Sequence, residues 1–127
     1  MNGLIEVLNP GIANSLQDAG RIGYRHMGIA VSGGLDPWLA RCANALLGNA
    51  PECACIEIRA AGPALGVVQG PVRFALAGDV SATRVLADGD EEEVTAWQSV
   101  TLYEGEELQI GFLPGGTAYV AVSGGFA

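Results

Sequence analysis

The stretch Cys55-Ile56-Glu57-Ile58-Arg59 alternates apolar and polar side chains, and it opens a region in which short apolar runs recur. A period of two residues is typical of a β-strand with one buried face. Similar runs follow at residues 65–68, 72–76 and 83–86. The pairs between the runs are Gly62-Pro63, Gly70-Pro71 and Gly78-Asp79. Because glycine and proline favour tight turns and interrupt strands, this region predicts short strands that follow one another through turns.

The same pattern extends in both directions from this region. Asp88-Gly89 indicates a hairpin turn, and the strands predicted after it lie at residues 94–97, 99–103, 107–112 and 117–123. Upstream, the turn cluster Asn9-Pro10-Gly11 separates predicted strands at residues 4–8 and 12–16. Short strands at regular spacing favour a mainly β fold, and the sequence predicts an antiparallel β-barrel that is closed or nearly closed.

One segment has the period of a helix instead. Asp36 suits the N-cap, Pro37 suits the first helical position, and Gly48-Asn49 supplies a stop. The apolar residues that would share one helical face are Leu39, Ala43, Leu46 and Leu47. We predict one helix of about three turns that covers an opening of the barrel.

Length and charge limit the classes of function. The chain has 127 residues, which predicts a single domain over residues 1–127. The formal net charge is −8 and all six basic residues are arginine, so neither nucleic acid nor a membrane is an expected partner. Without lysine the chain offers no biotin attachment site, no Schiff base and no P-loop. No covalently bound cofactor is therefore expected on this chain.

Neither a targeting segment nor a metal-binding pattern stands out. The first residues lack the positive charge of a signal peptide and no apolar run approaches ~18 residues, so a cytoplasmic protein is expected. The cysteines are Cys42, Cys53 and Cys55, and an odd number in a reducing compartment predicts free thiols. Cys53 and Cys55 have no second cysteine or histidine pair at zinc spacing, which favours structural thiols over a metal site.

The side chains best suited to catalysis or ligand binding lie in a glycine-rich stretch at residues 15–37. This stretch contains the only histidine, His26, together with Gln17, Asp18 and Arg21. Glycine permits backbone conformations that other residues avoid, so such a loop can fold back and direct these side chains toward a common space.

Each of these residues also has a purely structural interpretation. Asp18 and Arg21 can pair to hold a turn, and a single histidine is more often a hydrogen-bonded structural residue than an acid or base. Asn44 is a poor helix former in mid-helix, and it can bond back to the loop. Their concentration in one glycine-rich loop makes the functional interpretation about as strong as the structural one.

Three further features have structural interpretations. The acidic run at residues 88–93 lacks the spacing of a calcium loop and is predicted to be a solvated hairpin tip. Trp97 and Tyr103 flank a predicted strand and are expected in the core. The apolar segment at residues 118–126 reaches the end of the sequence, so we expect it to be exposed and to make the chain a homo-oligomer when alone.

The motifs of the chain resemble those of a known family. They are Ser15-Leu16-Gln17-Asp18-Ala19-Gly20-Arg21-Ile22-Gly23-Tyr24, His26-Met27-Gly28, Ser32-Gly33-Gly34-Leu35-Asp36-Pro37, Arg41-x-Ala43-Asn44-x-Leu46-Leu47-Gly48-Asn49, Glu57, Gly62-Pro63, Ala77-Gly78-Asp79 and residues 121–126. They resemble the N-terminal half of the biotin-dependent carboxyltransferase family, also called allophanate hydrolase subunit 2 or KipA-type, which includes one of the subunits of 5-oxoprolinase. The resemblance covers nearly the whole chain and implies a cyclophilin-like β-barrel.

The resemblance also implies a function. Family members look like subunits of enzymes that process small amides, either opening 5-oxoproline to glutamate with ATP or forming the carboxyltransferase part of urea carboxylase. The implied partners are a KipI-type subunit (allophanate hydrolase subunit 1), a third enzyme subunit and a small amide or lactam substrate. ATP or carboxybiotin would be held on partner chains. The alternative is a non-catalytic regulatory or structural module that binds a KipI-type partner. A prolyl isomerase ranks last, because only the barrel class suggests it.

Under the enzyme hypothesis, residues of the glycine-rich stretch and Asn44 of the predicted helix take roles. The catalytic residues are Asp18 and His26, as polar or acid/base groups. The substrate-binding residues are Gln17, Arg21, Tyr24, Ser32 and Asn44, with Arg21 as an anion clamp.

Overall fold

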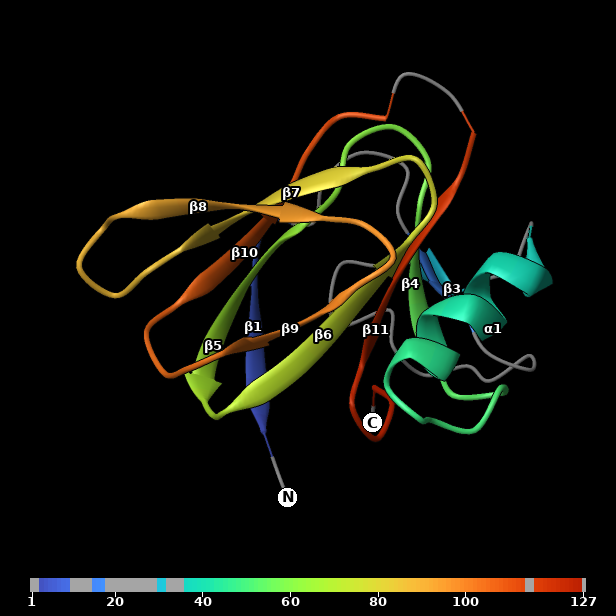
Figure 1. Ribbon diagram of the computed structural model, residues 1–127, viewed down its shortest axis with the longest axis horizontal. Coiled ribbons are helices and arrows are strands. Elements are labelled where there is room, and N and C mark those ends of the chain that lie inside the picture. The colour runs from blue at the N-terminus through green and yellow to red at the C-terminus, as the bar shows by residue number, and fades with distance from the viewer. Residues whose placement is uncertain (1–2, 10–14, 18–29, 32–35, 114–115, 127) are drawn as a thin grey trace.

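The computed structural model describes residues 3–9, 15–17, 30–31, 36–113 and 116–126. Within these residues the chain forms one helix and two β-sheets, one of five strands and one of six (Figure 1). No helix in this described part has the length and apolarity needed to cross a bilayer. The mainly β fold predicted from the sequence is confirmed.

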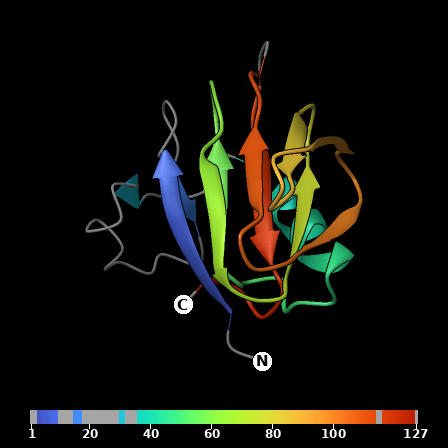
Figure 2. The same ribbon diagram turned by 90° about the vertical axis from the view of Figure 1, so that its left-hand side faces the viewer.

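The five-stranded sheet is antiparallel throughout. Its strands in spatial order are β1 (Leu4–Asn9), β5 (Ala64–Gln69), β10 (Glu107–Ile110), β7 (Ser81–Val85) and β8 (Glu91–Thr95). Figure 2 shows this sheet from its outer face, with β1 in blue beside β5 in green. Strands far apart in the sequence therefore lie side by side, because β10 pairs with both β5 and β7.

The six-stranded sheet holds the strands that position the candidate site. In spatial order they are β3 (Ala30–Val31), β2 (Ser15–Gln17), β4 (Cys55–Ile58), β11 (Ala118–Val122), β6 (Val72–Ala77) and β9 (Ser99–Leu102). β2 and β3 are parallel, whereas the other pairs are antiparallel. β4 and β11 are buried along their whole length, as expected for central strands covered on both faces.

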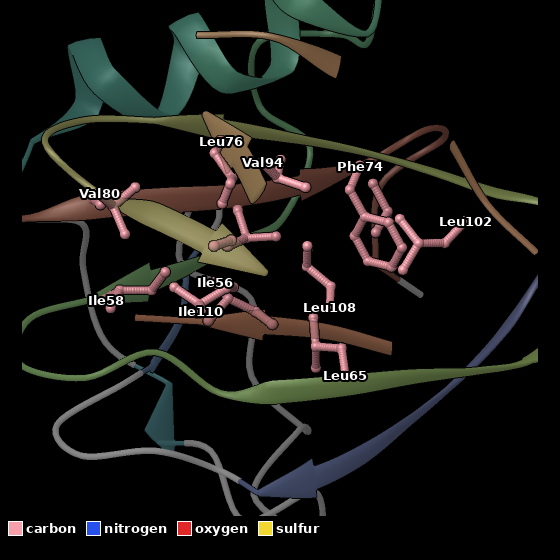
Figure 3. Close-up of a cluster of buried hydrophobic side chains, with 14 of the residues drawn as sticks. Ile56, Ile58, Leu65, Phe74, Leu76, Val80, Val94, Leu102, Leu108 and Ile110 are labelled. Carbon is pink, nitrogen blue, oxygen red and sulfur yellow. The ribbon is translucent and has the colours of Figure 1, made fainter. Parts of the chain in front are cut away.

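The main hydrophobic core lies between the two sheets (Figure 3). Alternate residues of each strand point into it, since successive side chains of a strand face opposite sides. The six-stranded sheet supplies Ile56, Ile58, Phe74, Leu76 and Val120, and the five-stranded sheet supplies Leu65, Val67, Leu108 and Ile110. Burial of each large side chain contributes about 1.5–3 kcal/mol.

The other face of the six-stranded sheet carries the helix α1 (Pro37–Leu46), which packs on β4, β6 and β11. The sheet residues beneath the helix include Ala75, Ala77 and Ala121, all fully buried. Small side chains at these positions let the helix approach the sheet closely. The helix itself contributes Ala43 to this second cluster, and Leu47 just after it adds a second apolar side chain.

The helix and its N-cap are confirmed. Asp36 precedes the first helical residue, Pro37, and its Oδ1 accepts a hydrogen bond from the backbone N–H of Leu39 at 3.1 Å. The helix ends at Leu46, just before Gly48, whose φ of +71° suits the predicted stop.

Loss of this cap gives a first testable prediction. We expect Asp36→Ala to lower the free energy of unfolding by about 1 kcal/mol, because the N–H of Leu39 loses its acceptor. Chemical denaturation measures the change. Asp36→Asn is the matched control, since asparagine caps about as well as aspartate; equal losses in both variants would contradict a role as N-cap.

The closed barrel is not confirmed. The described strands are divided between two separate sheets, and consecutive strands β8 and β9 belong to different ones. Strand spacing indicates where strands occur along the sequence. It does not determine which strands pair, because pairing depends on how the whole chain packs. The helix packs on a sheet face, so the prediction that it covers a barrel opening is wrong. The short parallel strand β3 was not predicted, and residues 12–14 of the predicted strand at 12–16 lie outside the described residues.

Three other predictions are corrected. Glu91, Glu92 and Glu93 belong to strand β8 rather than to a hairpin tip, and the turn holds only the start of the acidic run. Trp97 and Tyr103 are 46% and 54% exposed rather than in the core, because both lie outside the strands, where alternation no longer determines burial. The segment at residues 118–122 is the buried strand β11, paired on both sides, and Phe126 packs against the core.

Candidate active site

The candidate site is built where strands β4 and β11 pass under the N-terminal end of helix α1. Glu57 and Tyr119 are directly opposite each other in the β4–β11 pair, and both are completely buried. Their neighbours Ile56, Ile58 and Val120 point into the main core, so the alternation of the strands directs Glu57 and Tyr119 to the helix side.

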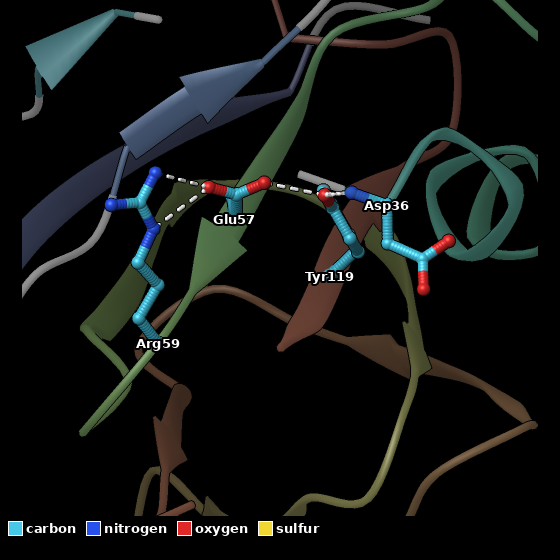
Figure 4. A network of polar contacts seen from close by, with 4 residues as sticks. All are labelled: Asp36, Glu57, Arg59 and Tyr119. Atoms are coloured by element: carbon cyan, nitrogen blue, oxygen red, sulfur yellow. Dashed lines mark hydrogen bonds and ion pairs between the residues drawn. The ribbon is translucent and has the colours of Figure 1, made fainter. Parts of the chain in front are cut away.

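A chain of hydrogen bonds links these two side chains to the start of the helix (Figure 4). The Tyr119 hydroxyl donates to Oε2 of Glu57 and accepts from the backbone N–H of Asp36 at 2.9 Å. The guanidinium of Arg59 donates to Oε1 of Glu57 from Nε and Nη2, at 3.0 and 2.9 Å. One oxygen of the buried Glu57 carboxylate therefore binds the positively charged guanidinium of Arg59, and the other binds the phenol of Tyr119. A buried charge needs partners of this kind.

Tyr119 is held in its protonated form. Burial, followed by the hydrogen bond to Glu57, raises the pKa of the Tyr119 phenol well above its ordinary value. The hydroxyl is therefore a fixed donor to Glu57 and a fixed acceptor for Asp36. Its role in the geometry is to hold Asp36, the N-cap residue of α1.

On the outer side of Asp36 lies an open hollow of about 640 Å³. Its lining combines two carboxylates, an indole and a hydroxyl with small and aliphatic residues: Asp36, Leu39, Gly78, Asp79, Val80, Ala96, Trp97, Gly116 and Thr117. The rings of Trp97 and Trp38 lie 6.3 Å apart between centroids, tilted by 52°. Such a surface can accept N–H hydrogen bonds and can stack on a planar group.

Trp97 is placed by its backbone. It has a φ of +67°, the left-handed region that residues with large side chains rarely adopt, and its N–H donates to the carbonyl oxygen of Leu76 at 2.7 Å. This bond ties the connection between β8 and β9 to strand β6, and it leaves the indole half exposed beside the hollow.

Comparison with known proteins identifies the family. A family model described as "Carboxyltransferase domain, subdomain A and B" matches residues 27–127. The chain belongs to this family. The resemblance inferred from the sequence motifs is thereby confirmed.

Relatives with similar sequences come from two kinds of enzyme. Urea amidolyase of Saccharomyces cerevisiae is 33% identical over 123 residues, which cover 95% of this chain and 6% of that protein. A 5-oxoprolinase subunit from Haemophilus influenzae is 30% identical over 124 residues, covering 97% of this chain and 38% of that protein. The chain thus spans well under half the length of either relative.

Solved structures agree with this assignment. The crystal structure of TTHA0988 superposes with a TM-score of 0.76 at 33% identity, over 98% of this chain and 25% of that one. The K. lactis urea amidolyase superposes with a TM-score of 0.77 at 31% identity, over 95% of this chain and 7% of that one. The fold is therefore that of carboxyltransferase-domain structures.

Most of the site residues predicted for this carboxyltransferase-family chain lie outside the described residues: Asp18, Arg21, Tyr24, His26 and Ser32. Their roles stay predictions. Gln17 is the last residue of β2, where its backbone pairs with Cys55 of β4. β2 therefore lies beside β4, the strand that carries Glu57.

Asn44 is fully buried in α1. Its Nδ2 donates to the carbonyl oxygens of Pro51 and Cys53 at 3.3 and 3.0 Å, and its Oδ1 accepts from Asn49 Nδ2 at 3.1 Å. Asn49 also donates to the carbonyl oxygen of Val122 at 2.7 Å. In this structure Asn44 bonds to the segment that follows the helix, and its role in substrate binding stays a prediction.

The three cysteines are unpaired thiols. Among the described residues, no group of three or more histidine, cysteine, aspartate or glutamate side chains could hold a metal ion. Cys55 is completely buried beneath the helix. Burial raises the pKa of the Cys55 thiol to about 12, although a hydrogen bond with Asn44 opposes the shift.

This shift predicts a loss of stability in alkali. Because the pKa of the thiol is raised in the folded state, its contribution is complete below the pKa of 9.0 of an unperturbed thiol and is lost as the pH rises toward 12. Between about pH 8 and pH 10.5 we expect the wild type to lose about 2 kcal/mol more than Cys55→Ala. Urea unfolding of both proteins at the two pH values measures the difference; equal losses would contradict it.

Three residues of the site escaped prediction from the sequence. Tyr119 stands in an apolar run that indicates only a strand. Trp97 was predicted at the end of the strand at residues 94–97 and expected in the core, whereas β8 ends at Thr95, and Asp79 was interpreted as a turn residue. Glu57 stands at a polar position of a strand that was predicted to have one buried face, whereas β4 is buried on both faces, so the pattern did not indicate that this carboxylate needs partners for its charge.

Proposed function

We propose that this chain is the carboxyltransferase-domain part of an enzyme that acts on a small amide, either a urea carboxylase or a 5-oxoprolinase. The observation that carries the proposal is the match to the family model over residues 27–127. The two kinds of relative, urea amidolyase and the 5-oxoprolinase subunit, both carry names of enzymes that act on an amide-like group.

In this proposal the hollow at the start of α1 receives the substrate. The carboxylates of Asp36 and Asp79 accept N–H groups, and Trp97 provides a flat apolar wall. Glu57 and Tyr119 are positioning residues: they fix the backbone of Asp36 and thus the direction of its side chain. The role of Arg59 is to neutralise the carboxylate on which this arrangement depends.

The activated group reaches the site from other chains in this proposal. The 127 residues contain no lysine, so biotin cannot be attached within them, and carboxybiotin or ATP held outside them would supply the activated carboxyl or phosphoryl group. We therefore expect activity only in a complex with a KipI-type subunit and a further enzyme subunit.

Reconstitution tests the proposal. The chain is co-expressed with a KipI-type subunit and a biotin-carrying or 5-oxoprolinase-type subunit, and ATP hydrolysis is measured with urea and with 5-oxoproline. We expect ATP hydrolysis that depends on one of the two substrates and that falls when this chain is omitted. Hydrolysis at the same rate with and without this chain would overturn the enzyme role.

A non-catalytic binding module is the second candidate. The observation that favours it is an apolar surface on β1 and β5, where Leu4, Leu8 and Val68 are each 44–54% exposed. Exposed apolar groups of this kind often mark protein interfaces. Formation of a stable complex with the KipI-type subunit, without any substrate-dependent turnover, would favour this candidate. Light scattering on the chain alone tests whether the same surface makes it a homo-oligomer.

A further inference from the structure

We propose that the outer face of the five-stranded sheet binds an amphipathic helix of a partner protein, one whose apolar side is bordered by lysine or arginine. The outer face consists of the side chains of β1, β5, β10, β7 and β8 that point away from the core. This inference rests on the proposed function, in which the chain works with partner chains, and it adds the surface and the chemistry of the contact.

The apolar part of the outer face lies on β1 and β5, which pair with each other. The side chains that point inward from these strands pack in or against the core: Ile5, Val7, Leu65 and Val67. Because successive side chains of a strand alternate, Leu4, Leu8 and Val68 point outward, and all three are exposed. In Figure 2 no described segment lies in front of β1 or β5. Exposed aliphatic side chains gathered on paired strands are typical of a protein interface.

Small residues on β5 make the apolar part accessible to a helix. Gly66 has no side chain, and a Cβ at this position would lie 3.1 Å from Cδ1 of Leu8, so Leu8 lies over the glycine. Ala64 is the next outward residue of β5. On the six-stranded sheet, α1 packs over a similar set of small residues: Ala75, Ala77 and Ala121. A helix can approach such a sheet surface closely, so a second helix suits the five-stranded sheet.

Carboxylates border the apolar part on both sides. Glu6 of β1 and Glu107 of β10 are the register partners of Gly66 on its two sides. Neighbouring strands lie about 4.8 Å apart, so the backbones at the two glutamates are about 10 Å apart, close to the diameter of a helix. A helix that lies along β5 would therefore have a carboxylate on each side.

The charges of the outer face indicate the charge of the partner. β8 adds Glu91 and Glu93, which alternate with inward residues of that strand. Arg84 is the only basic residue in the five strands, and its guanidinium is bonded to Glu106 at 2.8 Å. Lysine or arginine on the partner would be attracted to these carboxylates. A second copy of this chain, with its net charge of −8, would instead be repelled.

A synthetic peptide tests the surface directly. The probe is a helix of about 14 residues, or four turns, made of leucine and lysine with all leucines on one side. It is labelled for fluorescence anisotropy and titrated with the chain alone. We expect saturable one-to-one binding that weakens as salt is added. One control peptide has glutamate in place of lysine and another has the same composition without an apolar side, and neither should bind.

Variants of the apolar side chains locate the binding. Val68→Thr keeps the β-branched shape but adds a hydroxyl, and combined with Leu4→Thr it should weaken binding of the leucine–lysine peptide about tenfold. The control is Phe112→Thr, which changes an exposed apolar residue outside the five strands and should leave binding as in the wild type. Circular dichroism verifies that each variant is folded.

Variants of the carboxylates test the charge of the partner. Glu6→Gln combined with Glu107→Gln should weaken binding of the same peptide about three- to tenfold, because two exposed ion pairs are lost. Glu52→Gln is the matched control, since Glu52 is exposed and lies outside the five strands. It should bind the peptide as the wild type does.

Three outcomes would overturn the inference. The first is no saturable binding of the leucine–lysine peptide to the folded wild type, and the second is equal binding of the glutamate peptide. The third is a dimer of the chain alone, detected by light scattering and abolished by the combined Leu4→Thr and Val68→Thr changes, which would make a second copy the occupant. The titration needs neither substrate nor another subunit, so its failure leaves ATP hydrolysis by the reconstituted enzyme intact, and failure of that assay leaves peptide binding intact.

Discussion

Replacement of Gly78 by alanine is expected to lower the free energy of unfolding by about 3–5 kcal/mol and Tm by more than about 10 °C. Gly78 follows strand β6, lines the hollow and has a φ of +119°, a region that side-chain-bearing residues rarely adopt. A Cβ at this position would lie 2.9 Å from the carbonyl oxygen of Thr117 and 2.9 Å from the Cα of Ala118. Since these are backbone atoms next to and within the central strand β11, they cannot move aside cheaply.

Gly89→Ala is the matched control for this prediction. Gly89 has a φ of +94°, but a Cβ there would meet nothing within 4 Å. Gly89→Ala should lower the free energy of unfolding by about 1–2 kcal/mol, the penalty of the backbone conformation alone. Thermal unfolding of both variants separates the two contributions. A Gly78→Ala protein as stable as Gly89→Ala would mean that β11 is not packed against Gly78 as described.

The sequence predicted the elements of this fold better than their arrangement. The helix, its cap at Asp36 and most strands follow from local signals, namely hydrophobic period, N-cap chemistry and turn residues. The division into two sheets depends on which strands pair, and β10 pairs with β5 and β7, strands far from it in the sequence. Local periodicity contains no information on such pairings, so the closed barrel was an extrapolation from strand spacing.

The candidate site was harder to predict for the same reason. Asp36 and Tyr119 are 83 positions apart, and the bond between them exists only because β11 passes under the start of α1. Asp36 was correctly predicted as a cap, yet nothing in its neighbourhood in the sequence indicated that its N–H binds a phenol. Trp97 was expected in the core because large aromatic residues usually are, whereas its left-handed backbone turns it toward the hollow.

Tyr119→Phe is expected to lower the free energy of unfolding by about 3 kcal/mol. The ring and its packing remain, so the loss comes from hydrogen bonds alone. The hydroxyl is the donor to the buried Oε2 of Glu57 and the acceptor of the Asp36 N–H, and a lost hydrogen bond to a buried charged group costs more than one between neutral groups. Denaturant titration measures the change.

Tyr103→Phe is the control for this change, because Tyr103 is 54% exposed and the described structure has no hydrogen bond to its hydroxyl. It should change stability by less than about 0.5 kcal/mol. The positioning role of Tyr119 has a separate consequence: if its hydroxyl fixes Asp36, then Tyr119→Phe lowers substrate-dependent ATP hydrolysis in the reconstituted enzyme even where the protein is fully folded, whereas Tyr103→Phe does not. A Tyr119→Phe protein that is destabilised but supports ATP hydrolysis like the wild type would show that the hydroxyl supports the fold without orienting the hollow.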